Sequence, residues 1–210
     1  MGLNRNSVSV FKRIHGSKSN KCHTESTISP MLSDIMAEVY SYLWDESTVY
    51  ETANWMLHHD RWVNNTHSSN FTNFKRGDIV TIELGATNFR YEPSYEHPGV
   101  ILFSRKFFSL IVPCSTQKYG KGFPEIIDAN ETDGFKSNTG IQCESFRWVS
   151  NNRIINKKGK VSNRVLDAID GKILKLIPTY RKESNAMNKK LKEKEEEIKQ
   201  LKEEIAELKK

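Results

Sequence analysis

Hydrophobic positions in the first third of the chain predict helices. Apolar residues recur every three or four positions over residues 31–43, with Ser29 placed as an N-cap and Pro30 at the first helical position. A second stretch with helical spacing follows, and together they predict a helical hairpin over residues 28–66. Residues 1–27 are polar, basic and without a period, so we expect a disordered basic arm there.

The pattern then changes from a helical period to short alternating or continuous apolar runs. Such runs, separated by Gly, Pro and Asn, are typical of strands in a small barrel. The predicted strands cover residues 78–85, 99–103, 109–112, 124–128, 140–143 and 146–149. Helical spacing returns over residues 165–176 and ends before Pro178. The sequence therefore predicts an α+β chain with a barrel domain over residues 74–180.

The last segment, residues 185–210, has the spacing of a charged helix. Its apolar positions step by four and three alternately, with one lysine among them: Met187, Leu191, Lys194, Ile198, Leu201, Ile205 and Leu208. These are the a and d positions of about three heptads, and Lys194 weakens the seam at a d position. Two interpretations stay open, a short coiled coil that sets the oligomeric state and a single solvated helix.

Charge adds a candidate partner. The 210 residues contain 32 Lys and Arg against 26 Asp and Glu, a net charge of +6. A basic cluster without acids runs from Arg147 to Arg164 and includes Trp148. Cations beside an aromatic ring suit a nucleic acid, although a solvated Lys-rich loop is the plain alternative.

Several function classes find no support in the sequence. Three cysteines without CxxC spacing indicate free thiols in a reducing cytoplasm, and no run of 18 apolar residues predicts a membrane span. The chain has no glycine-rich phosphate-binding loop and no HExxH motif, so we expect neither a cofactor nor a metal. Cys114 lies in an apolar run and is interpreted as a small core residue.

Five short motifs occur in order along the predicted barrel. Arg76-Gly77-Asp78-Ile79-Val80 opens it, Glu92 precedes His97-Pro98 by four variable residues, and an apolar run ends at Thr116. Gly134-Phe135 and the stretch containing Glu144, Arg147 and Arg153 follow. This order resembles the MazF/PemK (Kid-like) family of toxin endoribonucleases over roughly residues 74–177.

The resemblance implies a small SH3-like barrel with a closing C-terminal helix, usually a homodimer. It implies metal-independent cleavage of single-stranded RNA, in which the 2′-hydroxyl attacks the phosphate and leaves 2′,3′-cyclic phosphate and 5′-hydroxyl ends. It also implies a neutralising antitoxin protein as a partner.

The resemblance also implies roles for particular residues. His97 stands where the family usually carries Arg, and Thr116 would stabilise the transition state, with Ser115 as a substitute. The remaining implied RNA contacts are Glu92, which would position His97, Tyr95, which would stack on a base, and Arg147 and Arg153, which would bind phosphates. His97 indicates either acid–base catalysis, a weakened site that still binds RNA, or a structural histidine.

An endoribonuclease toxin is therefore the leading hypothesis. A non-catalytic nucleic-acid-binding barrel and an oligomeric interaction module are the alternatives.

Overall fold

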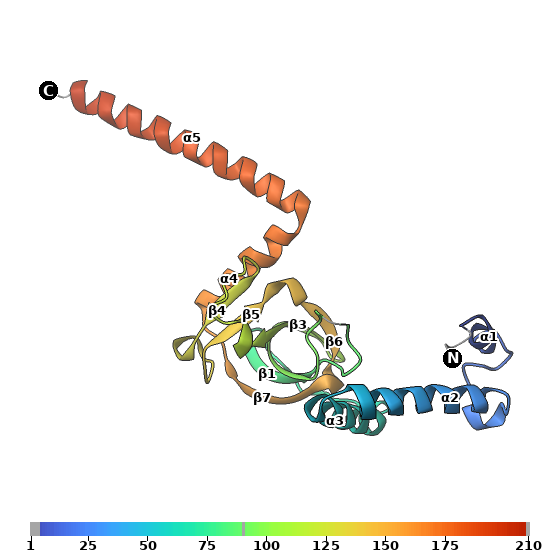
Figure 1. The fold of residues 1–210 in the computed structure, drawn as a ribbon. Helices are drawn as coiled ribbons and strands as arrows, with labels where there is room; N and C mark the ends of the chain where they lie inside the picture. The colour runs from blue at the N-terminus through green and yellow to red at the C-terminus, as the bar shows by residue number, and fades with distance from the viewer. Residues whose placement is uncertain (1–4, 90, 209–210) are drawn as a thin grey trace. The chain divides into compact units, whose positions relative to one another are not determined.

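The computed structural model describes residues 5–89 and 91–208. The chain divides into two compact units, with the boundary between Asp60 and Arg61. The first unit contains α1 (Arg5–Phe11), the turn η1 (Cys22–Thr24), α2 (Ile28–Ser41), the π-helical turn η2 (Tyr42–Glu46) and most of α3 (Val49–Asn65) (Figure 1). No residue of α2 or α3 is buried, and the pairing of these helices as a hairpin stays a prediction.

Two sequence expectations for this unit differ from the structure. The N-cap of α2 is Thr27 rather than Ser29, so Pro30 lies inside the first turn, where a missing N–H costs no hydrogen bond. Helix α1 forms within the expected disordered arm, where Val8 and Phe11 are three residues apart and partly buried. The helix is too short for its apolar residues to form a recognisable helical period, so the sequence did not predict it.

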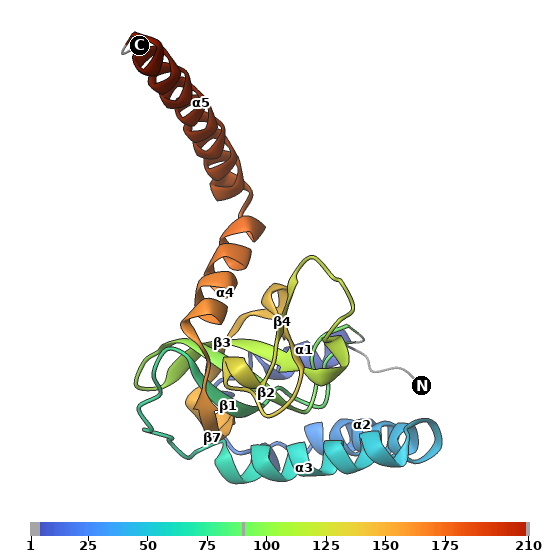
Figure 2. The same ribbon diagram turned by 90° about the vertical axis from the view of Figure 1, so that its left-hand side faces the viewer.

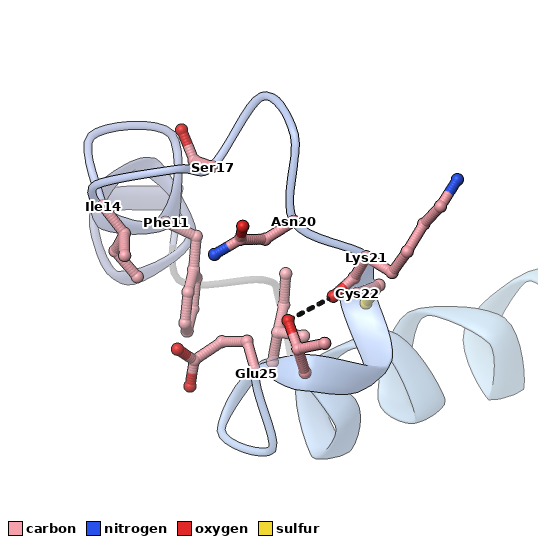
Figure 3. Close-up of a pocket in the computed structure, with 9 residues that line it drawn as sticks. Phe11, Ile14, Ser17, Asn20, Lys21, Cys22 and Glu25 are labelled. Atoms are coloured by element: carbon pink, nitrogen blue, oxygen red, sulfur yellow. Dashed lines mark hydrogen bonds between the residues drawn. The ribbon is translucent and has the colours of Figure 1, made fainter.

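A small pocket lies in the first unit (Figure 3). Phe11, Ile14 and Ile28 give it an apolar side, and a hydrogen bond from Thr24 Oγ1 to the Lys21 carbonyl, 2.7 Å, lies on its wall. The pocket contains none of the residues that the sequence predicted to act on RNA.

The second unit is built on an antiparallel sheet. Its strands are β1 (Asp78–Glu83), β2 (Glu96–Ser104), β3 (Phe108–Ser115), β4 (Ile126–Ala129), β5 (Thr139–Gln142), β6 (Arg147–Ser150) and β7 (Ile154–Lys160). The pairing order is β4-β5-β3-β2-β1-β7, and β6 also pairs with β3. Figure 1 shows the strands curving around a common centre. Among the described strands no ladder joins β7 to β4 or β6, so the closed SH3-like barrel stays a prediction.

Strand β7 was not predicted from the sequence. Only Ile154 of its seven residues is buried, and the rest are mostly exposed lysines and polar residues. Its single ladder to β1, from Ile82↔Ile154 to Asp78↔Lys160, holds it in place through backbone hydrogen bonds. Because β7 buries so little, its side chains carry no periodic signal. Half of the basic residues in the predicted cluster lie on this strand rather than in a loop.

Alternate residues of β1, β2 and β3 supply two apolar clusters. Val80, Ile82, Ile101 and Ile111 belong to one cluster. The other cluster takes residues from the opposite face of the same strands, namely Ile79, Val100, Leu102, Val112 and Cys114. This second cluster is covered by α4 (Asn163–Leu176), whose buried residues are Val165, Leu166 and Ile169 (Figure 2). Each fully buried Ile or Val contributes about 1.5–3 kcal/mol of transfer free energy. Helix α5 (Pro178–Leu208) completes the chain.

The start of α4 is fixed by Asp133, in the turn η4 (Glu131–Asp133). Its carboxylate accepts hydrogen bonds from Arg164 Nε at 3.1 Å and Nη2 at 2.5 Å, and from Ser162 Oγ at 2.9 Å. The hydrogen bonds from Arg164 lower the pKa of Asp133 against the opposing effect of burial, and Ser162 helps them. The next residue, Gly134, has φ +94°, and a Cβ there would lie 2.1 Å from the Lys160 carbonyl oxygen.

We expect Gly134→Ala to destabilise the fold by about 3 kcal/mol or more, because it combines a left-handed conformation with a backbone clash. Gly122→Ala is the matched control: Gly122 has φ +70°, and a Cβ added there would meet nothing within 4 Å. It should cost only about 1 kcal/mol. Urea unfolding measures both, and equal losses would show that the approach of Lys160 is unimportant.

We expect Asp133 to make stability depend on pH at the acidic end. Its folded pKa is lowered, so its contribution is complete above the pKa of the unfolded carboxyl, about 4, and is lost as pH falls through the folded pKa. The advantage of wild type over Asp133→Asn, measured by urea unfolding, should therefore shrink steadily below about pH 5. An advantage that is constant down to pH 3 would contradict this assignment.

Candidate active site at one edge of the sheet

The ends of four strands meet at one edge of the sheet. Ile82, at the end of β1, lies opposite His97 at the start of β2 and opposite Ile154 at the start of β7. β3 ends at the same edge, because Gly99 lies opposite Pro113 two residues before Ser115. The antiparallel register therefore brings together segments that are far apart in the sequence.

His97 is half-buried at this edge and is held by one hydrogen bond. Its Nδ1 lies 2.9 Å from the carbonyl oxygen of Cys114 on β3. A carbonyl oxygen can only accept, so Nδ1 carries the proton in the neutral ring and Nε2 keeps its lone pair. The histidine is thus oriented by the backbone, with the nitrogen that can take up a proton left on the other side of the ring.

Thr116 and Ser115 lie directly beyond this anchor. Ser115 is the last residue of β3, and Thr116 opens the exposed turn η3 (Thr116–Lys118). The turn packs closely on β5, since a Cβ on Gly140 would come within 2.7 Å of the Lys118 carbonyl carbon. Ser115 and Thr116 thus follow directly after Cys114, whose carbonyl holds His97.

The loop before His97 is tied back to the sheet at its base. The Leu84 N–H donates to the Tyr95 carbonyl at 2.8 Å, and the Tyr95 N–H donates to the Gly85 carbonyl at 2.7 Å. Tyr95 has φ +66°, a left-handed conformation that is unfavourable for an aromatic residue. Strain of this kind, two residues before His97, marks the loop as constrained.

The hydrogen bonds of Glu92 are made by its backbone. Glu92 is exposed, its N–H donates to the Phe89 carbonyl at 2.8 Å, and its own carbonyl accepts from Ser94 Oγ at 3.2 Å. Within residues 5–89 and 91–208 no hydrogen bond joins Glu92 to His97, so the expected positioning role finds no support in the geometry.

The two candidate phosphate ligands lie in different places. Arg153 Nη1 donates to the Glu83 carbonyl at 3.1 Å, which puts Arg153 at the same sheet edge as His97. Arg147 lies opposite Ile111, four residues along β3 from Ser115, or about 13 Å at strand spacing. Since Ile111 and Ser115 share one face of the strand, Arg147 is on the face of Ser115 but farther along it.

Sequence patterns did not indicate the role of Arg61, in the last turn of α3. Its Nη1 lies 2.8 Å from Glu83 Oε2, and its Nη2 pairs with Glu96. Burial works against the charge of Arg61, but its hydrogen bonds to Glu96 and Glu83 outweigh burial and raise the pKa. Arg61 thereby offsets part of the negative charge of two carboxylates close to His97 in the sheet.

One signal in the sequence pointed toward such a cation. Glu83 ends a strand whose apolar residues are Ile79, Val80 and Ile82. A buried carboxylate needs a charged partner. Nothing in the local sequence, however, identifies a partner 22 residues upstream.

The buried thiols and the possible metal ligands are candidates for other chemistry within residues 5–89 and 91–208. Burial, followed by the charge of Cys143, raises the pKa of the Cys114 thiol far above its usual range. Burial and the Glu144 charge raise the pKa of Cys143 to about 12, so neither thiol is a nucleophile at neutral pH. Among the described residues no three His, Cys, Asp or Glu side chains are grouped to hold a metal ion, and no helix is long and apolar enough to cross a membrane.

Comparison with known proteins identifies the domain that contains this edge. Residues 75–177 match the family described as PemK-like, MazF-like toxin of type II toxin-antitoxin system. No curated protein matches the chain.

Similar solved structures cover about half of the chain. MazE-MazF (Form-II) from Deinococcus radiodurans is 16% identical, with 51% of this chain and 97% of that chain covered and a TM-score of 0.40. MazF (Form-I) from the same organism is 16% identical, with coverage of 50% and 96% and a TM-score of 0.42. An endoribonuclease in complex with its cognate antitoxin from Mycobacterial species is 13% identical, with coverage of 48% and 91% and a TM-score of 0.39.

We expect the neutral form of His97 to be the Nδ1–H tautomer, because the Cys114 carbonyl accepts from Nδ1. Two-bond ¹⁵N–¹H correlation spectra distinguish the tautomers, and exposed His67 provides the internal control. A neutral ring that carries its proton on Nε2 and none on Nδ1 would show that this hydrogen bond does not orient the ring.

Proposed function

Residues 75–177 form a PemK-like, MazF-like toxin domain, a family of endoribonucleases, and we propose that this protein is a metal-independent endoribonuclease that cuts single-stranded RNA. The observation that carries the proposal is the anchored His97 beside Ser115 and Thr116 at one sheet edge. An imidazole and hydroxyl donors are sufficient for transesterification of RNA without a metal.

His97 acts as the proton carrier of this reaction. Its Nε2 accepts the proton of the RNA 2′-hydroxyl as the 2′-oxygen attacks the adjacent phosphorus. The bond from phosphorus to the 5′-oxygen breaks, that oxygen takes up a proton from water, and His97 then releases the proton that it accepted to the solvent. The products are a 2′,3′-cyclic phosphate and a 5′-hydroxyl.

The exposed hydroxyl of Thr116 stabilises the charge that develops on the phosphoryl oxygens, and Ser115 is the neighbouring donor. The family carries Arg where this chain has His97, so the permanent positive charge must come from elsewhere. Arg153 is the basic residue that the register brings to the same edge, and Arg147 binds a phosphate farther along the RNA. Tyr95 stacks on a base beside the site.

The protein works as a homodimer of SH3-like barrels and is neutralised by an antitoxin protein. The family match supports the antitoxin as a partner, because its description names a toxin–antitoxin system. The Mycobacterial endoribonuclease similar to this chain was solved with its cognate antitoxin.

The decisive test is cleavage of a long single-stranded RNA in EDTA with analysis of the end groups. We expect wild type to leave 2′,3′-cyclic phosphates, His97→Ala to lose about 10²–10⁴-fold in rate, and Thr116→Ala to lose about 10–10³-fold. His97→Arg, which restores the residue that the family usually carries, should keep activity, because a guanidinium group can bind the phosphate bidentately. His67→Ala should cleave like wild type.

Equal cleavage by wild type and His97→Ala would move the acid–base role to another residue. Salt-sensitive RNA binding without any product would favour the non-catalytic nucleic-acid-binding alternative over the enzyme.

A further inference from the structure

Helix α5 presents an apolar seam that nothing in the described chain covers. The helix is uninterrupted from Pro178 to Leu208 (Figures 1 and 2). The apolar seam residues are between 50% and 68% exposed: Met187, Leu191, Ile198, Leu201 and Ile205. Their alternating steps of four and three residues keep them on one stripe, which is the geometry of a coiled-coil interface.

We propose that this seam binds the same seam of a second copy of the chain, as a parallel, in-register, two-stranded coiled coil. This inference is independent of the proposed ribonuclease activity. It specifies both the partner and the relative orientation of the two helices. Each follows from the residues on and beside the seam.

The seam residues favour two parallel strands. The heptad places Leu191, Ile198 and Ile205 at a positions and Leu201 at a d position. β-Branched residues at a with leucine at d favour parallel dimers over trimers and tetramers. Lys194, at d, costs stability, but within its own helix it pairs with Glu197 at 2.5 Å, which offsets its charge.

The flanking charges choose the parallel orientation. In a parallel dimer each g residue faces the e residue five positions later on the partner helix. Here Lys190 would face Glu195 and Glu197 would face Lys202, so both described pairs are attractive. The sequence continues the pattern with Glu204 and Lys209, the latter outside the described residues.

The antiparallel alternative places like charges together. The alignment that pairs a with d positions sets Met187 against Ile205 and centres the helices near residue 196. Glu195 would then face Glu195, and Glu197 would face Glu197, across the dimer axis. Lys190 would face Glu204 on each side, so two attractive pairs offset these two repulsive ones, whereas every described pair of the parallel arrangement is attractive.

The test is disulfide trapping in the full chain. Cys22 is exposed and is replaced by Ser, while Cys114 and Cys143 are buried. In this background Met187→Cys should cross-link to its copy in a glutathione redox buffer, because equivalent positions meet only in a parallel pair. A mixture of Met187→Cys and Ile205→Cys chains should give no excess of the mixed disulfide.

Charge swaps test the pairing itself without changing net charge. The e-swap, Glu195→Lys with Lys202→Glu, leaves the Lys194–Glu197 pair intact and should lower cross-linking at residue 187 at least about tenfold. The g-swap, Lys190→Glu with Glu197→Lys, should do the same alone. Mixing the two variants should restore the cross-link, because every inter-chain pair is then again attractive.

A control swap separates pairing from helix stability. Lys189→Glu with Glu196→Lys exchanges charges on the outer f positions and should leave cross-linking unchanged. Preferential disulfides between Met187→Cys and Ile205→Cys chains would overturn the proposal in favour of antiparallel helices. No cross-link with either cysteine, or cross-linking that ignores the e- and g-swaps, would show that the seam does not bind a second copy in this way.

Discussion

The register of β1, β2 and β3 is the constraint on which the second unit depends. Side chains alternate between the faces of a strand, so a slip of one residue would turn every apolar side chain of one cluster toward the other. The observed pairing, with Val100 opposite both Ile79 and Val112, keeps Ile79, Val100 and Val112 together under α4. The same pairing sets His97 beside the Cys114 carbonyl, so the core and the candidate site are fixed by one set of backbone hydrogen bonds.

Charge at the site edge is balanced by long-range pairing. Glu83 and Glu96 lie on neighbouring strands and would repel both each other and a polyanion. Arg61 bridges them, and Arg153 binds the Glu83 backbone, so the edge carries two guanidinium groups with its two carboxylates. The proposed site has a histidine where the resemblance implies an arginine, so a phosphate bound there would depend on these two guanidinium groups for positive charge.

The sequence predicted elements best where side chains were strongly periodic. Six strands and helix α4 were found at or near their observed positions, because their apolar residues are buried on a regular face. Strand β7 was missed because its stability comes from its ladder to β1 rather than from buried side chains. The N-cap of α2 was misplaced because the preference for Ser29 over Thr27 did not decide where the helix starts, and Thr27 makes no side-chain capping hydrogen bond.

For the site, the ordered motifs from Arg76 to Arg153 were enough to indicate the family and to select His97 and Thr116. The heptad and its flanking charges are likewise a property of the sequence, since an isolated helix needs only its own spacing to form a stripe. Only the tertiary structure decided that the Cys114 carbonyl holds His97 and that Arg61 bridges Glu83 and Glu96. These contacts join residues 17 to 35 positions apart. Such contacts are set by strand register and chain path, which local residue patterns do not encode.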